Sequence, residues 1–112
     1  MIESYSFGRM VIEGRVYTQD LIIYPDRIEG SWWRKSGHSV CHNDIKGILE
    51  EKPDVLVVGK GSPGMMDVLS CAKRALLEQG ITLIEEPTEN AFKTYNKISK
   101  NKKVCGAFHL TC

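Results

Sequence analysis

The stretch DVLVVGKGSPGMM, Asp54–Met66, decides the fold. Val55–Val58 is an apolar run without alternation, which is typical of a strand that is covered on both faces. A glycine-rich loop follows, in which Ser62 and Pro63 suit the N-cap and the first position of a helix. The stretch therefore predicts a buried strand, a tight loop and the start of a helix.

Downstream of this unit, short apolar strands alternate with amphipathic helices. The first helix is expected to run to Gln79, and Gly80 follows it as a C-terminal cap. Ile81–Ile84 is a second apolar strand. Pro87 opens a further helix, and Lys102–Leu110 is the last strand. This β-α-β-α-β order predicts a parallel or mixed sheet with right-handed crossovers.

The first half of the chain reads as antiparallel strands followed by a short helix. Arg9–Tyr17 has a glycine turn at its centre, and the strands Asp20–Tyr24 and Arg27–Trp33 flank a Pro-Asp turn. A short helix is expected over His42–Glu51, ended by Pro53. The prediction is one compact α/β domain over residues 1–112. It has a mixed, largely parallel central sheet flanked by helices and an antiparallel N-terminal β-meander.

Composition excludes several classes of protein. A net charge of about +1 over 112 residues gives no field that would attract nucleic acid or a membrane. No apolar run approaches the roughly 20 residues that span a bilayer, and the first ten residues do not resemble a secretory signal. The four cysteines are not spaced like a disulfide framework. We therefore expect a cytoplasmic protein with reduced thiols.

Four segments carry a resemblance to a known family. They are SWWRKSGHSV, VVGKGSPGMM, PTENAFKTYNKI and VCGAFHL, and the most specific mark is Thr94–Asn96. The chain resembles small single-domain proteins that include a mitochondrial respiratory complex I assembly factor, an adipogenesis-associated protein and many uncharacterised archaeal and bacterial members. The resemblance implies a compact α/β fold with a mixed central sheet and an assembly-factor-like role. It implies no catalytic residues.

The glycine loop is a candidate site for an anion or another small molecule. GKGSPG matches the G-x-G-x-x-G pattern, in which glycines allow close approach and helix N–H groups hold a phosphate. The simpler alternative is a tight turn, since Pro63 removes one N–H donor and Asp67 competes with an anion. The candidate residues of this alternative function are Gly59, Lys60, Gly61, Ser62, Gly64 and Glu85.

Other constellations are weaker. Zinc could find N and S ligands in two motifs, but the spacing matches no strong pattern. The candidate ligands are His38, Cys41 and His42 in the first motif and His109 and Cys112 in the second. Cys41 beside His42, or Ser62, could be a nucleophile, but no orienting acid is identifiable. Lysines near the end of the last helix lack the aromatics that nucleic-acid binding needs. We therefore expect no catalytic set, metal or cofactor.

The adjacent tryptophans favour a protein-interaction module. Trp32 and Trp33 follow one another on an expected strand, so they point to opposite faces. One of them can be buried while the other anchors a contact. We place the contact surface around Trp33, Arg34 and the loop Gly59–Gly64. The partner is expected to be another protein or a second copy of the chain.

Overall fold

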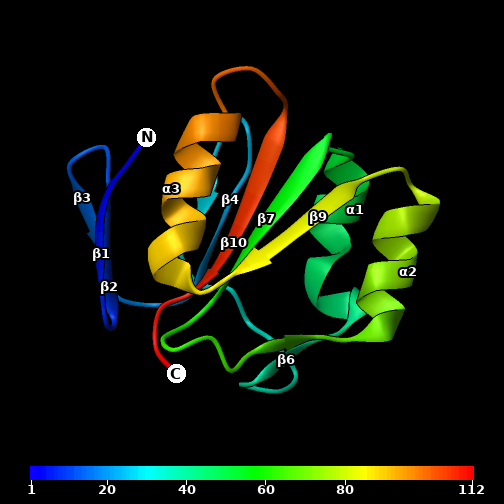
Figure 1. The fold of residues 1–112 in the computed structure, drawn as a ribbon, viewed down its shortest axis with the longest axis horizontal. Coiled ribbons are helices and arrows are strands. Elements are labelled where there is room, and N and C mark those ends of the chain that lie inside the picture. The colour runs from blue at the N-terminus through cyan, green and yellow to red at the C-terminus, as the bar shows by residue number, and fades with distance from the viewer.

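The computed structural model describes residues 1–112 and is built around a mixed five-stranded sheet (Figure 1). The strand order is β5-β4-β10-β7-β9, formed by Ile28–Glu29, Leu21–Ile23, Val104–His109, Val55–Lys60 and Thr82–Glu86. Strands β10, β7 and β9 run parallel, whereas β4 is antiparallel to β10 and β5 is antiparallel to β4. The predicted α/β fold with a mixed central sheet is confirmed.

The two central strands are buried along almost their whole length. Every residue of β10 is buried, as are the first five residues of β7. Their parallel register sets Val104 against Val55 and His109 against Lys60. A strand covered on both faces can be apolar at every position, and this is the pattern that Val55–Val58 shows.

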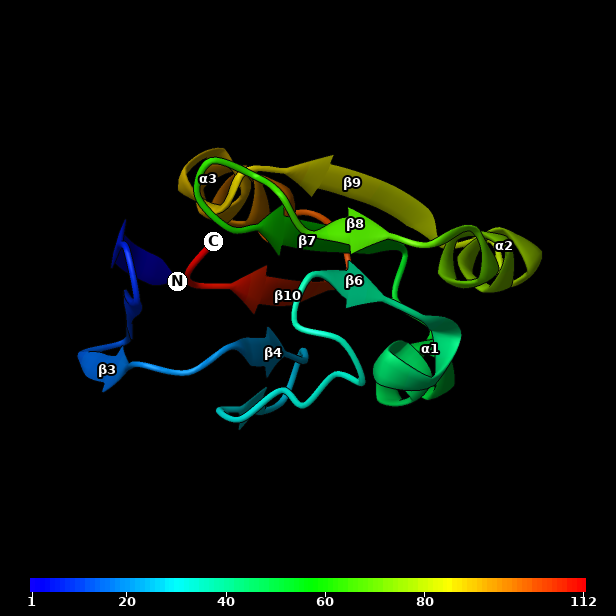
Figure 2. The same cartoon turned by 90° about the horizontal axis from the view of Figure 1, so that it is seen from below.

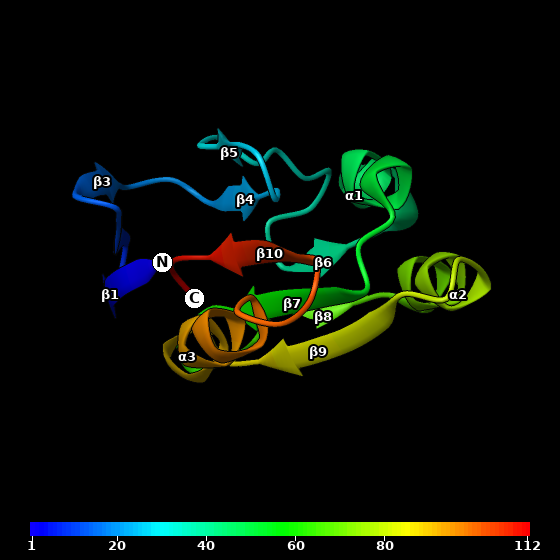
Figure 3. The same cartoon turned by 90° about the horizontal axis from the view of Figure 1, so that it is seen from above.

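Helices cover both faces of the sheet (Figure 3). On one face lie the 3₁₀ turn η1 (His42–Ile45), α1 (Lys46–Glu51) and α2 (Ser70–Glu78). On the other face lies α3 (Thr88–Ile98). Each face has its own apolar core, one of 15 buried residues and one of 12. The predicted helix after Pro87 and the predicted final strand are both confirmed.

The N-terminal strands form a separate antiparallel sheet beside α3 (Figure 1). It contains β1 (Ile2–Ser6), β2 (Arg9–Ile12) and β3 (Arg15–Tyr17). The side-chain amide of Asn96 both accepts a hydrogen bond from the Ile2 N–H (2.9 Å) and donates one to its carbonyl (2.7 Å). The Thr94–Asn96 motif therefore has a structural role, because Asn96 docks β1 onto α3.

The helix start predicted at Ser62–Pro63 is wrong. The chain instead continues through a loop into the short strand β8 (Asp67–Val68), and α2 begins only at Ser70. β8 pairs in parallel with β6 (Ser39–Val40) in a two-stranded ribbon at the end of the molecule where β7 and β10 finish (Figure 2). Burial of Met66 and Val68 outweighs the local helix signal.

The helices are all short. None is long and apolar enough to cross a membrane.

Candidate functional site

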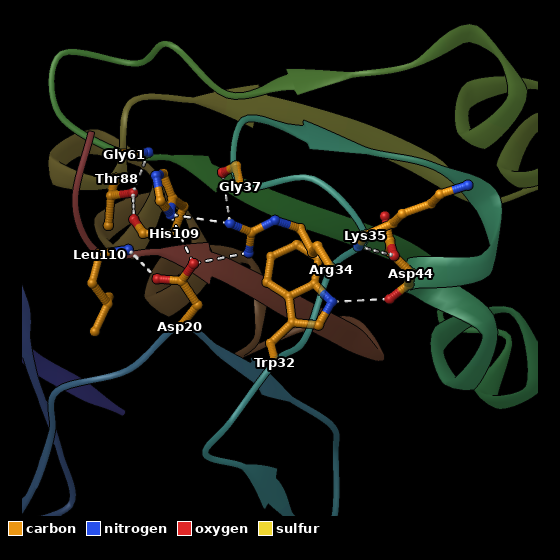
Figure 4. Close-up of polar contacts among 10 residues, drawn as sticks. All are labelled: Asp20, Trp32, Arg34, Lys35, Gly37, Asp44, Gly61, Thr88, His109 and Leu110. Carbon is orange, nitrogen blue, oxygen red and sulfur yellow. Dashed lines mark hydrogen bonds and ion pairs between the residues drawn. The ribbon is translucent and has the colours of Figure 1, made fainter.

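Three polar side chains from distant parts of the chain meet at the carboxyl end of β10 (Figure 4). They are Asp20 before β4, Arg34 between β5 and β6, and His109, the last residue of β10. Arg34 Nη1 lies 2.8 Å from Asp20 Oδ2 as an ion pair, and His109 Nδ1 lies 2.7 Å from the same oxygen. The Arg34 and His109 side chains are only 4% and 7% exposed. We call these three residues the clamp.

Geometry fixes the position of a proton in the clamp. A guanidinium can only donate and an ionised carboxylate can only accept, so the short contact to Asp20 requires the proton on His109 Nδ1. The longer approach of Arg34 Nη2 to Nδ1 (3.3 Å) is then close packing. Nη2 instead donates to the Gly37 carbonyl (2.9 Å). The clamp thus ties the segment after β5 to the end of the central sheet.

Asp20 is held as a carboxylate. Burial alone would raise its pKa, but hydrogen bonds from His109, from the Leu110 backbone and from Arg34 outweigh burial and lower the pKa. The Leu110 N–H donates to Oδ1 at 2.8 Å, so both carboxylate oxygens have partners. A carboxylate that accepts this many hydrogen bonds favours its charged form.

Acid is therefore expected to destabilise the protein through Asp20. Because folding lowers this pKa, the stabilisation is complete above the unfolded value of about 3.9 and is lost as the pH falls through the folded value. Urea unfolding between about pH 6 and pH 2.5 measures this dependence. It should be shallower in Asp20→Asn and unchanged in the control Asp26→Asn, which removes an exposed ion pair with Arg27. Equal slopes in both variants would contradict the role of Asp20.

The clamp fixes one tryptophan and leaves the next exposed. Trp32 is 6% exposed: its backbone N–H donates to the Asp20 carbonyl (2.7 Å) and its Nε1–H donates to the Asp44 carbonyl (2.9 Å). The Arg34 guanidinium lies 4.6 Å from the centre of its ring, a cation–π contact. Trp33 is 77% exposed. Trp33 therefore stands between two immobilised residues.

The structure places the two predicted contact residues differently. Trp33 lies at the surface, but Arg34 points inward to the clamp, so its guanidinium is not free to contact a partner. The predicted strand Arg27–Trp33 is too long, because β5 covers only Ile28–Glu29 and the tryptophans lie in the loop that follows. The contact between Arg34 and the Trp32 ring, rather than sheet pairing, turns Arg34 inward.

The glycine loop is closed by the rest of the chain. The Gly61 N–H donates to Thr88 Oγ1 (2.8 Å), and the Ser62 N–H donates to the Thr111 carbonyl (3.0 Å). Gly64 packs on Pro87, and a Cβ at Gly59 would lie 2.7 Å from Phe108. Without a helix start at Ser62, the loop offers neither a helix N-terminus nor these N–H groups to an anion.

Lys60 and Glu85 lie together, as expected for the carboxyl ends of adjacent parallel strands. Lys60 Nζ lies 3.6 Å from Glu85 Oε1, and Lys73 Nζ lies 3.4 Å from Oε2. The Glu85 carboxylate is thus shared between two ammonium groups, and the three side chains together carry a net charge of +1. Lys60 is thus engaged in an ion pair rather than directed at the glycine loop.

The clamp side chains are largely enclosed by the rest of the chain. His109 Nε2 is buried without a partner, but none of the three surface pockets is lined by a clamp residue. The His38 and His109 rings lie edge to face at 6.3 Å, yet no group of three or more His, Cys, Asp or Glu side chains could hold a metal ion. The contacts of the clamp hold the segment after β5 against the end of β10.

Sequence reasoning misses Asp20 and His109 as partners. They are 89 residues apart, and they meet because Phe108 pairs with Leu21 across β10 and β4. The sequence contains one signal for this pair, namely a histidine at the end of an otherwise apolar strand. A histidine in that position needs an acidic side chain beside it.

Comparison with known proteins places this arrangement in a family. The family model described as "Protein of unknown function (DUF498/DUF598)" matches residues 2–109. The chain belongs to the DUF498/DUF598 family. The match spans the clamp, both tryptophans and the glycine loop, so all of these lie within the family domain. It confirms the family resemblance carried by the sequence.

Solved structures share the whole DUF498/DUF598 fold. A conserved hypothetical protein, PH1505 from Pyrococcus horikoshii OT3, is 31% identical with a TM-score of 0.85, covering 100% of this chain and 99% of that one. A structure titled MT938 is 26% identical with a TM-score of 0.83, covering 100% and 98%. XCC1710 from Xanthomonas campestris, at 21% identity and a TM-score of 0.85, covering 98% and 83%, shares the fold.

Proposed function

We propose that the protein is a non-enzymatic interaction module with an assembly-factor-like role, and that Trp33 anchors its contact with another protein. The observation that carries the proposal is the 77% exposure of Trp33 on a segment whose neighbours are immobilised. Tryptophan is enriched among the residues that dominate binding energy, so an exposed tryptophan in a fixed position can serve as the anchor of a contact.

The fixed position of the residues on both sides of Trp33 supports the proposal. The chain between β5 and β6 has little regular sheet bonding of its own, so the Trp32 and Arg34 contacts decide how Trp33 is presented. An anchor that is already in place loses less conformational entropy when a partner binds. The buried clamp therefore holds Trp33 in position for a partner, although no clamp residue contacts that partner.

The expected effect of removing the anchor is large. A tryptophan buries about 150–250 Å² when it is covered, and hot-spot residues cost at least about 2 kcal/mol on truncation to alanine. That corresponds to roughly a 30-fold loss of affinity. Trp33→Ala should change the free energy of unfolding by no more than about 0.5 kcal/mol, because the side chain is exposed.

The test is recovery of partners by tagged protein produced in its own host, quantified by mass spectrometry. Trp33→Ala should lose specific partners that the unmodified chain retains. The matched control is Leu77→Ala, which truncates another exposed apolar side chain (78%) on α2. Equal recovery by both variants would contradict the proposal. Sedimentation equilibrium of the purified chain distinguishes a second copy from a different protein as the occupant.

We place this role in the cytoplasm. All four cysteines are unpaired, which suits a reducing compartment.

A further inference from the structure

A pocket of about 510 Å³ lies between the segment after Arg34 and the start of α2, separate from the clamp. Two thiols, an imidazole, a carboxylate and an ammonium group line it, namely Cys41, Cys71, His42, Asp44 and Lys35. This set of nucleophilic and titratable groups is not used by the proposed contact at Trp33. Its chemistry can therefore be considered independently.

The short β6–β8 ribbon brings the two thiols to one place. Val40 pairs with Val68, and the Leu69 N–H donates to the Val40 carbonyl (2.9 Å). Cys41 follows β6 directly, and Cys71 lies in the first turn of α2 just beyond β8. Because the strands are parallel, both cysteines leave the ribbon at the same end and line the same pocket.

The four cysteines differ sharply in environment. Cys71 and His42 line the same pocket, and the neighbouring His42 lowers the pKa of the Cys71 thiol. Burial raises the pKa of Cys105 to about 12, so that thiol is inert. Cys112 is exposed at the end of the chain. Cys71 is thus the thiol best prepared to attack.

The Cys41 thiol has a carboxylate rather than an imidazole as its neighbour. Its Sγ–H donates to Asp44 Oδ2 at 3.2 Å, and the same carboxylate oxygen accepts the Cys41 N–H at 2.9 Å. The thiol proton therefore already has an acceptor, which suits a group that attacks second. A carboxylate in this position can take the proton as the new sulfur–sulfur bond forms.

We propose that this pocket is a thiol–disulfide exchange site for low-molecular-weight peptide disulfides, with Cys71 as the attacking thiol and Cys41 as the second thiol. The Cys71 thiolate attacks one sulfur of the disulfide, a mixed disulfide forms, and the other half leaves as a thiolate that His42 can protonate. Cys41 then attacks Cys71 Sγ, its proton passes to Asp44, and the second half leaves. Two protein thiols are oxidised to one disulfide, and one external disulfide is reduced to two thiols.

The lining indicates the class of substrate. Lys35 offers a positive charge to a carboxylate, and Ser36, Ser39 and Asn43 offer hydrogen bonds to peptide groups. The volume lies within the range of small-molecule sites and suits a short peptide rather than a folded protein. Oxidised glutathione is a peptide disulfide of this kind and serves as the probe.

The experiment exposes the purified reduced protein to oxidised glutathione and follows each cysteine by peptide mass mapping. We expect Cys71 to react faster than Cys112, and a Cys41–Cys71 disulfide to accumulate. Cys41→Ser should stop at a mixed disulfide on Cys71, and Cys71→Ser should prevent the internal disulfide. His42→Ala, a change at an exposed position, should slow the reaction of Cys71 several-fold while Cys112 keeps its rate.

Two results would overturn the proposal. If Cys71 reacts no faster than Cys112, or if its rate is unchanged in His42→Ala, then Cys71 is not an activated thiol. If a mixed disulfide on Cys71 is stable while Cys41 is intact, then Cys41 does not act as the second thiol. Circular dichroism of each variant establishes that it is folded. Neither result bears on the contact at Trp33.

Discussion

Replacing Arg34 with alanine is expected to lower the free energy of unfolding by about 3–5 kcal/mol. The guanidinium is buried, and it compensates the Asp20 carboxylate at 2.8 Å. Truncation leaves that carboxylate next to His109 without its ion-pair partner, and it removes the hydrogen bond to the Gly37 carbonyl. Since a domain of this size has a total stability of about 5–15 kcal/mol, the variant should be only marginally folded.

Urea unfolding of Arg34→Ala beside Lys35→Ala measures this effect. Lys35 is the exposed neighbour with no ion pair of its own, so its truncation should change the free energy of unfolding by less than about 0.5 kcal/mol. A loss below about 1 kcal/mol for Arg34→Ala would place its guanidinium in solvent and would contradict the clamp.

Gly61→Ala is expected to destabilise the protein by at least about 3 kcal/mol. Its φ of +87° is unfavourable for any residue with a Cβ. In addition, the new Cβ would overlap the Thr111 carbonyl oxygen and would lie 2.6 Å from His109 Cδ2. The loop must move, and the hydrogen bonds from Gly61 and Ser62 move with it.

Gly80→Ala is the matched control for this change. Gly80 has a similar φ of +71°, but no atom lies within 4 Å of the position that its Cβ would take. The substitution therefore carries only the backbone strain, about 1–2 kcal/mol. The difference in the free energy of unfolding between the two variants, from thermal or urea unfolding, measures the cost of the close contact at Gly61. Equal losses would mean that the end of the chain does not pack on the glycine loop.

Most of the fold could be predicted from local patterns. Val55–Val58 and the last strand are apolar along their length, and α3 combines a proline start with regular apolar spacing. These signals are strong because they repeat over many residues. The helix start at Ser62–Pro63 failed because two residues carry a cap signal, whereas burial of Met66 and Val68 is decided by tertiary packing.

The candidate site was only partly predictable for a related reason. Lys60 and Glu85 end neighbouring parallel strands, so the strand order alone brings them together. Asp20 and His109 depend on the register between β4 and β10, which local sequence does not contain. Side-chain alternation predicts only that Trp32 and Trp33 point to opposite sides; the contacts of Trp32 with Asp20 and Asp44 decide that Trp33 is the exposed one.

The most direct test of the central claim is site-specific photo-crosslinking in the native host. Benzoylphenylalanine replaces Trp33 in one variant and Leu77 in the other, since both positions are about equally exposed. We expect a discrete crosslinked protein from position 33 that is absent from position 77. That product should disappear when Arg34→Ala is added at a temperature where this variant remains folded. The same crosslinks from both positions, or none from position 33, would contradict the role of Trp33 as the anchor of a protein contact.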